Sequence, residues 1–418
     1  MTMKSVLLGA AAAIASIGTA QAADLPLTKG EAVEYVKVCS AFGPGFFYIP
    51  GSDTCLKIGG EIRADYRVFG GSKAYKFSRD DNRSAFNTQA RIWFDARTQT
   101  DWGLLRSYFQ INADSHKISD THTYNSNTFS IDKAFIQFGG LTAGYAHSFF
   151  GFYDNDYGDT IWAPYYAESN TVNLIAYTAQ FGGGFSATLS VEDGRDHRQD
   201  KLFNDQGGQQ VPDVVGQLRF DQEWGAVAVQ GAGHQFRTNG QFADDFGRNR
   251  NKYGWAVGGS GLIKLPFIDG GHFVVEGQYA NGALDYLGIG NTQIGGQDFF
   301  VDNRGQFKGG KGWSIVAELG GNITPQLNAN LVGSYIDTKY DNVAGGLGGG
   351  KLTVKELTVA ANLAYTVVKG LTISAEAAYT RSDNGDGFDN GKTGSDHVAV
   401  EKGKGNIWQG GVRLKRVF

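Results

Sequence analysis

The sequence holds few of the residues on which several protein classes depend. It has 7 prolines and 2 cysteines in 418 residues, too few for a collagen-like chain or for a scaffold built on many disulfides. After the N-terminus, no apolar run approaches the roughly 20 residues that a membrane-spanning helix needs. Glycine is abundant, with 61 residues, and aromatic residues reach 13%. A membrane β-barrel has this profile, because half of the residues in each strand are polar.

Residues 1–22 have the pattern of a secretory signal peptide. Lys4 supplies the positive end, residues 6–17 form a short apolar core, and residues 20–22, Ala-Gln-Ala, form a small-residue cleavage motif. We expect this segment to be removed on export. Its removal takes away the one charge of Lys4 and changes the formal net charge from -4 to -5. A mildly acidic chain of this kind is not expected to bind nucleic acid.

The two cysteines, Cys39 and Cys55, are separated by fifteen residues. In an exported chain a pair this close favours a disulfide, which would tie the N-terminal segment 23–54 to the start of the first strand. Two free thiols, or half of a metal site, are the alternatives. No histidine lies near enough in sequence to complete a zinc-ligand spacing.

The segment 55–69 alternates strictly between apolar and polar positions. Ile58 and Ile62 belong to one side, and Glu61 and Arg63 belong to the other. Alternation with a period of two predicts a β-strand with one apolar and one wet face. A reversed strand would place five charges against apolar surroundings, so the facing is well determined. The segment by itself fits either a soluble β-sandwich or a membrane barrel.

The connections between the predicted strands alternate between short and long without exception. An outer-membrane barrel has short periplasmic turns, long extracellular loops and an even number of strands, whereas a soluble sandwich has no reason for this segregation. Seven short and eight long connections predict an all-β fold, in which residues 55–418 form a transmembrane antiparallel β-barrel of sixteen strands. The short connections are 100–103, 139–141, 182–184, 224–225, 266–271, 324–326 and 369–370. The long connections are 70–84, 116–127, 150–170, 193–212, 237–252, 285–310, 341–350 and 382–404.

Three motifs near the N-terminus resemble the opening of the alphaproteobacterial general porins. They are Val-Glu-Tyr-Val-Lys-Val-Cys at 33–39, Gly-Phe-Phe-Tyr-Ile-Pro-Gly at 45–51 and Thr-Cys-Leu-Lys-Ile-Gly-Gly at 54–60. The later strands match this family in pattern only, through to the terminal Phe418. The Pro-Glu-Phe-Gly-Gly-Asp signature of enterobacterial porins is absent from the sequence.

The resemblance implies a homotrimer of sixteen-stranded barrels in the outer membrane of a Gram-negative bacterium, in contact with its lipid. It also implies passive passage of small hydrophilic solutes and ions, with no catalysis and no cofactor. In this family the loop after the fifth strand folds into the lumen and narrows it, and here that loop is 150–170.

A barrel of sixteen strands is too wide to be filled by side chains, so selectivity depends on charges at its narrowest level. Inward-facing basic residues cluster on neighbouring strands, and the loop expected in the lumen is acidic. A basic wall that faces an acidic loop would set a transverse field across the passage. Arg97 and Arg106 alternatively belong to a vestibule. The basic candidates are Arg63, Arg67, Arg91, Arg97, Arg106, Arg413 and Lys415, and the acidic candidates are Asp154, Asp156, Asp159 and Glu168.

Other functions compete with passive diffusion. A barrel enzyme would need a nucleophile or an activated water beside a histidine and a carboxylate, but the 7 histidines are scattered through loops and strand ends. A substrate-specific channel or an adhesin is the other alternative, and inward-facing Trp93 and Tyr108 would suit a sugar channel. The Asp-rich segment 383–389 lacks the spacing and closing glutamate of an EF-hand, so we predict a solvated outer loop and no metal site, with a loose calcium site as the alternative.

Overall fold

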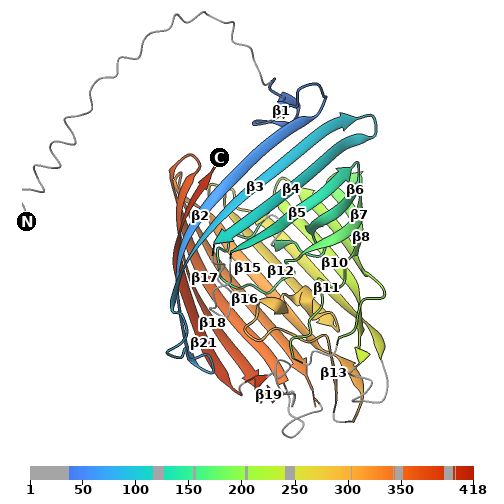
Figure 1. Ribbon diagram of the computed structural model, residues 1–418, viewed down its shortest axis with the longest axis vertical. Helices are drawn as coiled ribbons and strands as arrows, with labels where there is room; N and C mark the ends of the chain where they lie inside the picture. The colour runs from blue at the N-terminus through green and yellow to red at the C-terminus, as the bar shows by residue number, and fades with distance from the viewer. Residues whose placement is uncertain are drawn as a thin grey trace, which may run out of the picture.

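The computed structural model describes most of the chain beyond the predicted signal segment, which lies outside the described residues. Sixteen of its strands are antiparallel neighbours in one closed barrel (Figure 1). The described residues are 37–115, 127–153, 157–202, 206–240, 250–302, 304–341, 343, 352–389, 399–400 and 402–418. The barrel strands are β2 (Cys55–Lys73), β3 (Ser84–Thr100), β4 (Gly103–Ser115), β5 (Thr128–Phe138), β6 (Leu141–His147), β7 (Thr171–Gly182), β8 (Phe185–Glu192), β9 (Asp213–Gln222), β10 (Gly225–Arg237), β11 (Asn251–Lys264), β12 (His272–Asn281), β15 (Lys311–Thr324), β16 (Leu327–Tyr340), β17 (Leu352–Val368), β18 (Leu371–Gly385) and β21 (Lys404–Val417).

The first and last barrel strands close the sheet. β21 pairs with β2 from Glu61↔Val417 to Lys73↔Gly405, and it pairs with β18 on its other side. Closure removes the free edges that an open sheet would expose to aggregation. The predicted all-β barrel of sixteen strands is therefore confirmed.

Short turns lie at one end of the barrel, the end that carries β1 (Phe47–Tyr48) and the C-terminus in Figure 1. Each predicted short connection falls at this end. In their described parts, the long connections join strands at the opposite end, and they contain the remaining short elements, apart from the helix η1 (Ser40–Phe42) near β1. These elements are η2 (Leu284–Leu287), η3 (Ile289–Asn291), β13 (Phe299–Val301), β14 (Phe307–Gly309), β19 (Phe388–Asp389) and β20 (Ala399–Val400). Among the described residues, none of the helices is long and apolar enough to cross a lipid bilayer.

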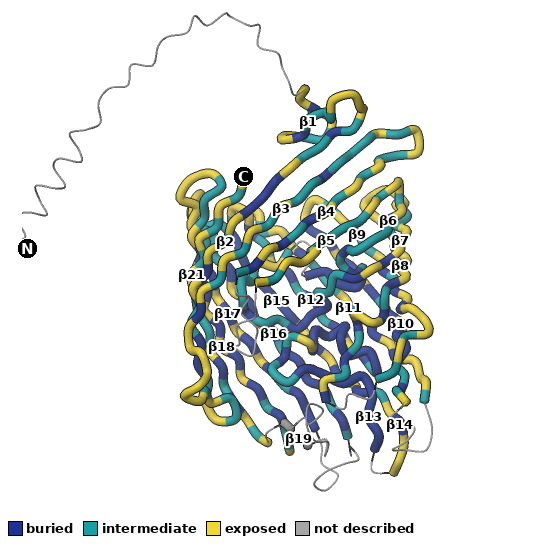
Figure 2. Tube along the Cα trace, viewed as in Figure 1, coloured by how far each residue is buried: buried dark blue, intermediate teal, exposed yellow. Residues whose placement is uncertain are grey.

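The two faces of each strand differ as the alternation predicts. On β2, Ile62 points outward and is 49% exposed, whereas its neighbour Glu61 points inward and is 7% exposed. Figure 2 shows buried and exposed residues alternating along the barrel strands. The exposed apolar side chains form the surface that lipid covers, and the charged side chains line the interior.

Strand β2 continues beyond the point where the sequence predicts a loop. The Gly70-Gly71 pair predicts a break, yet β2 extends to Lys73 and stays paired with β21 up to that residue. A Cβ atom at position 70 would stand 2.1 Å from the indole of Trp408 on β21. Glycine at this position therefore leaves room for an aromatic side chain of the neighbouring strand instead of ending the sheet.

A small cap precedes the barrel at the short-turn end. Cys39 and Cys55 form a disulfide, as predicted, and they pack with the buried Phe46. The Arg97 guanidinium on β3 lies 4.9 Å from the centre of the Phe46 ring. β1 pairs with the start of β2, so the cap is joined to the barrel sheet. The domain boundary placed at residue 54 stays a prediction.

Candidate pore constriction

Loop 148–170 connects β6 to β7. The strands that hold this loop are on the opposite side of the barrel from β6 and β7, as the strand order shows. The backbone N–H groups of Ile161, Trp162 and Ala163 donate to the Glu376 carboxylate on β18 at 2.6–2.7 Å. Glu376 occupies an inward position between the exposed Ala375 and Ala377. One carboxylate therefore fixes three consecutive residues of the loop against the inner surface.

Three further carboxylates repeat this contact along the same side of the barrel. Glu276 on β12 accepts the N–H of Tyr153 at 2.7 Å, and Glu318 on β15 accepts the Tyr153 hydroxyl. Glu356 on β17 accepts the Tyr166 hydroxyl at 2.8 Å. We call Glu276, Glu318, Glu356 and Glu376 the carboxylate wall. Sequence reasoning missed their role, although each is an acid at an inward position of a strand.

The seven basic candidates come together on β21, β2, β3 and β4, which are consecutive in the barrel. We call Arg63, Arg67, Arg91, Arg97, Arg106, Arg413 and Lys415 the basic wall. Arg63 and Lys415 are direct partners in the β2–β21 register, and Arg91 pairs with Glu61 in the β2–β3 register. These residues therefore lie on neighbouring strands, and their place at a constriction stays a prediction.

Carboxylates are interleaved with the basic wall, and they offset part of its charge. Glu61 contacts the Arg63 guanidinium and lies 3.6 Å from that of Arg91. Asp65 accepts two hydrogen bonds from Arg413, at 2.8 and 2.7 Å. The wall is therefore a network of paired charges with an excess of basic residues.

Arg97 and Arg106 form a separate group at the short-turn end of the barrel. Both donate to Asp95, at 2.6 Å from Arg97 Nη2 and 2.8 Å from Arg106 Nε. Arg97 is the register partner of Cys55, which places the group beside the disulfide cap. This position fits the vestibular alternative.

Loop 148–170 meets the basic wall through an aromatic side chain. The Trp162 indole N–H donates to Asp65 at 3.2 Å. The guanidinium of Arg413 lies 5.0 Å from the centre of the Trp162 ring, and that of Arg67 lies 5.6 Å from it. Cation–π contacts therefore join the loop to the wall at the point where the sequence suggested facing carboxylates.

The acidic candidates do not form one group. Asp159 has a side chain that is 52% exposed and lies near Glu318 and His272. Partial burial, and then the charge of Glu318, raise the pKa of Asp159 above its ordinary value. Asp154 and Asp156 lie outside the described residues.

Glu168 is only 1% exposed and belongs to a buried polar cluster, so it does not line a passage. His197 Nε2 lies 3.1 Å from Glu192 Oε2, and its Nδ1 lies 3.3 Å from Asp285 Oδ2 and 3.9 Å from Glu168 Oε1. Burial lowers the pKa of His197, but hydrogen bonds to Asp285 and Glu192 outweigh burial and raise it well above its ordinary value. The cluster fastens the end of loop 148–170 to two other long connections. The sequence alone could not show that Glu168 anchors the loop instead of lining the passage.

A cavity of about 350 Å³ lies where the loop, the basic wall and the long connection after β12 meet. Aromatic and polar side chains line it together, among them Arg67, Phe69, Tyr153, Trp162, Tyr165 and Gln409. The inward-facing Trp93 and Tyr108 suggested by the sequence are not among its lining residues.

Comparison with known proteins gives one consistent family. Residues 24–411 match the family described as Porin subfamily. The chain is 30% identical over 405 residues to the porin Omp2b of Brucella suis, covering 92% of this chain and 93% of that protein. It is also 30% identical over 440 residues to the porin Omp2a of Brucella suis biovar 1, covering 100% of both.

Solved structures share the fold at low sequence identity. The outer membrane channel DcaP of Acinetobacter baumannii aligns with a TM-score of 0.66 and 14% identity, over 89% of this chain and 99% of that chain. The trimer form of OmpT from Vibrio cholerae aligns with a TM-score of 0.53 and 11% identity, over 88% of this chain and 100% of that chain. The closed barrel and the full-length match lead to one conclusion: the chain belongs to the porin subfamily and is a general diffusion porin of the outer membrane, not an enzyme.

Proposed function

We propose that loop 148–170 narrows the lumen, and that ions and small hydrophilic solutes pass between this loop and the basic wall. The observation that supports this most strongly is the set of hydrogen bonds from Ile161, Trp162 and Ala163 to Glu376. Through these bonds the loop covers the carboxylate wall. The open part of the passage is then bordered by the basic wall.

The basic wall gives this passage a preference for anions. Its seven basic residues outnumber Glu61, Asp65, Asp95 and Asp132, the four carboxylates that the described ion pairs of the wall involve, so positive charge is in excess there. Arg63 and Arg91 are central to this excess, because both contact the same carboxylate, Glu61. Fixed charges that line an aqueous pore attract ions of opposite sign and repel ions of like sign.

Reversal potentials of single channels in a salt gradient test this proposal. Replacing Arg63 and Arg91 by serine removes two lumenal charges and no lipid-facing atom, so ion preference should shift toward cations while the barrel stays folded. Arg195→Ser is the matched control, because Arg195 is 67% exposed and pairs with Asp193 in the loop after β8. An unchanged reversal potential in the double variant, or an equal shift in the control, would contradict the proposal.

We further propose that three barrels assemble into a homotrimer. The outward strand faces carry many small residues, and a Cβ atom would meet no neighbouring atom within 4 Å at Gly216, Gly233, Gly259 or Gly333. Small outward residues permit close approach of a second barrel. The mass of the detergent-solubilised protein, measured by light scattering with the detergent contribution subtracted, should equal three chains, and a monomer mass would exclude the assembly.

A substrate-specific channel is the second candidate, and the cavity beside Trp162 favours it. Its volume of about 350 Å³ and its aromatic lining suit a ligand with both apolar faces and hydroxyl groups, such as a sugar. Sugar flux into liposomes decides between the two candidates. A general porin gives flux that rises linearly with concentration, whereas a specific channel saturates and loses its saturation in Trp162→Ala.

A further inference from the structure

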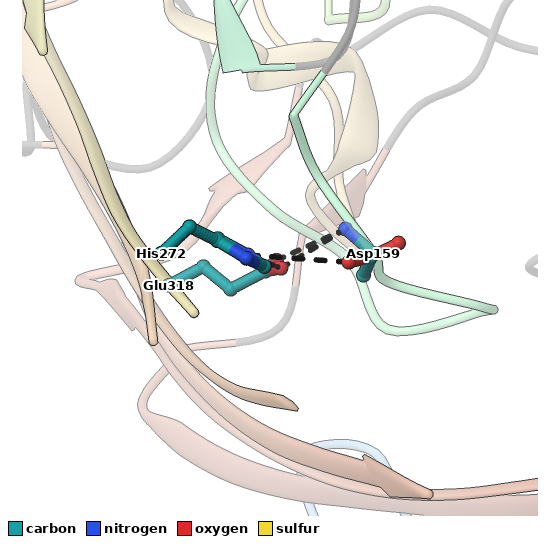
Figure 3. A group of neighbouring side chains, drawn as sticks. All are labelled: Asp159, His272 and Glu318. Atoms are coloured by element: carbon teal, nitrogen blue, oxygen red, sulfur yellow. Dashed lines mark hydrogen bonds and ion pairs between the residues drawn. The ribbon is translucent and has the colours of Figure 1, made fainter. Parts of the chain in front are cut away.

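Three side chains with metal-binding atoms converge between the barrel wall and loop 148–170. They are His272 at the start of β12, Glu318 on β15 and Asp159 on the loop, and Figure 3 shows them pointing toward one another. One ligand atom from each lies within 4.8 Å of the others. The three residues are far apart in the sequence, so no spacing motif predicts that they form a metal site.

The distances suit a small divalent ion. His272 Nε2 lies 3.2 Å from Glu318 Oε1 and 3.9 Å from Asp159 Oδ2. Nitrogen and oxygen ligands bound about 2.1 Å from a tetrahedral ion stand roughly 3.4 Å apart. Small side-chain movements of the partly exposed Asp159 would therefore complete three coordination positions.

The surrounding residues orient two of these ligands. In the tautomer with hydrogen on Nδ1, the His272 ring donates to the Gly270 carbonyl at 3.2 Å, and its Nε2 lone pair points toward the two carboxylates. The Tyr153 hydroxyl donates to Glu318, and so does the Asp159 backbone N–H. Outer partners of this kind, a carbonyl behind a histidine and donors behind a carboxylate, are typical of protein metal sites.

The site has an entry path from water. The Asp159 side chain is 52% exposed, whereas Glu318 is fully covered. A bound ion would keep its remaining coordination position toward the lumen. Nitrogen from imidazole combined with two carboxylates suits zinc and neighbouring transition ions better than magnesium or calcium, which prefer all-oxygen sites.

We propose that Asp159, His272 and Glu318 bind a divalent transition-metal ion of the zinc type and fasten loop 148–170 to the β12–β15 wall. The bound ion adds positive charge to the loop side of the lumen. It therefore lowers channel conductance for cations and stabilises the position of the loop. The binding claim does not depend on the proposed path of solutes, although its effect on conductance does.

Calorimetric titration tests the binding itself. The mature, untagged porin in detergent is treated with a chelator, dialysed, and titrated with ZnCl₂, and separately with MgCl₂. We expect saturable binding of about one Zn²⁺ per chain and no saturable binding of Mg²⁺. The absence of saturable Zn²⁺ binding, or equal binding of both ions, would overturn the proposal.

Variants locate the site. His272→Gln and Asp159→Asn should each weaken Zn²⁺ binding by at least about tenfold. Asp159→Asn changes an exposed loop residue, so it tests the site even if the strand variant fails to fold. His147→Gln on β6 is the matched control and should bind as the parent does. Unchanged affinity in Asp159→Asn, or an equal loss in His147→Gln, would place the metal elsewhere. If a variant loses Zn²⁺ binding but keeps the reversal potential of the parent, the binding claim stands and the site lies outside the proposed solute path.

Discussion

The carboxylate wall and the basic wall both place charges at inward strand positions, but they use them differently. Glu276, Glu318, Glu356 and Glu376 are at most 4% exposed, because hydrogen-bond donors of loop 148–170 cover them. The side chains of Arg63 and Arg91 keep 20% and 22% of their surface exposed. Inward charge that protein donors cover holds structure in place. In the proposed passage, inward charge that water reaches remains available to passing ions.

The difference follows from what each charge can find as a partner. A buried carboxylate is costly without donors, and a buried backbone N–H is costly without an acceptor. Loop 148–170 supplies hydrogen-bond donors to the carboxylate wall, and the carboxylate wall supplies acceptors to the loop. The arginines of the basic wall carry several donors spread over a planar group, so neighbouring carboxylates pair with part of each group and water reaches the rest.

Among the changes that test the difference between the two walls, loss of Glu376 should have the largest effect on the channel. Glu376→Ala leaves three backbone N–H groups without their acceptor, at about 1 kcal/mol for each lost bond. Residues 161–163 should leave the wall, and single-channel recordings should show changed conductance with added noise. Glu223→Ala, in the exposed turn before β10, is the control. Parent-like conductance in Glu376→Ala would show that the carboxylate wall does not hold the loop.

Removal of the Asp65 charge should increase the net positive charge of the basic wall. Asp65→Asn deletes the ion pair to Arg413 and adds net positive charge beside Trp162. Reversal potentials should shift toward anions, by less than the opposite shift in the Arg63/Arg91 double variant because one charge changes instead of two. Asp101→Asn, in the exposed turn between β3 and β4, removes the same charge outside the wall. A shift toward cations in Asp65→Asn would contradict the role given to this wall.

The buried cluster around His197 should make loop anchoring sensitive to alkaline pH. The folded pKa of His197 is raised well above its ordinary value, so its stabilisation is complete below about pH 6.5 and is lost as the pH rises through the folded pKa. Burial also raises the pKa of Glu168 well above its ordinary value, which gives a pH dependence of the same sign. The thermal unfolding midpoint should fall on going from neutral to alkaline pH, and His197→Gln should reduce that fall. An equal alkaline fall in both proteins would assign it to other groups.

Replacing both cysteines should have the smallest effect on the channel. The disulfide spans 16 residues of sequence, and loss of such a link costs about 3 kcal/mol in the chain-entropy picture. Because the cap lies beside Arg97, away from Trp162, ion preference should stay the same while thermal stability falls. Cys39→Ser/Cys55→Ser is compared with the parent by reversal potential and by melting. A changed ion preference would tie the cap to the constriction.

The fold could be predicted from the sequence because its signals are local. Alternation in 55–69 fixes which face of β2 meets lipid, and the lengths of the connections fix the two ends of the barrel. The basic wall follows from the same rule, since Arg63 and Arg91 are inward positions on adjacent strands. The boundary at Gly70 could not be predicted, because the glycine accommodates Trp408 from the other end of the chain.

The acidic half of the site could not be predicted, because it depends on contacts between distant residues. Glu168 and Asp159 belong to the same loop, yet one is buried beside His197 and the other is exposed near Glu318. No local pattern distinguishes them. Likewise, an inward glutamate such as Glu376 resembles any lumen-lining acid until the backbone of residues 161–163 is placed on it.

Cysteine accessibility tests the central claim most directly, since both native cysteines are in the disulfide and leave no background. Gln89→Cys places a thiol at a half-buried inward position on β3, beside Arg63 in the register. Val332→Cys places one at an inward position on β16 that is 1% exposed and packs with the same cluster as Phe152 and Tyr153. A small, charged, thiol-specific reagent should react quickly at position 89 and much more slowly at position 332. Equal rates would mean that water reaches both sides alike, and that loop 148–170 does not divide the lumen as described.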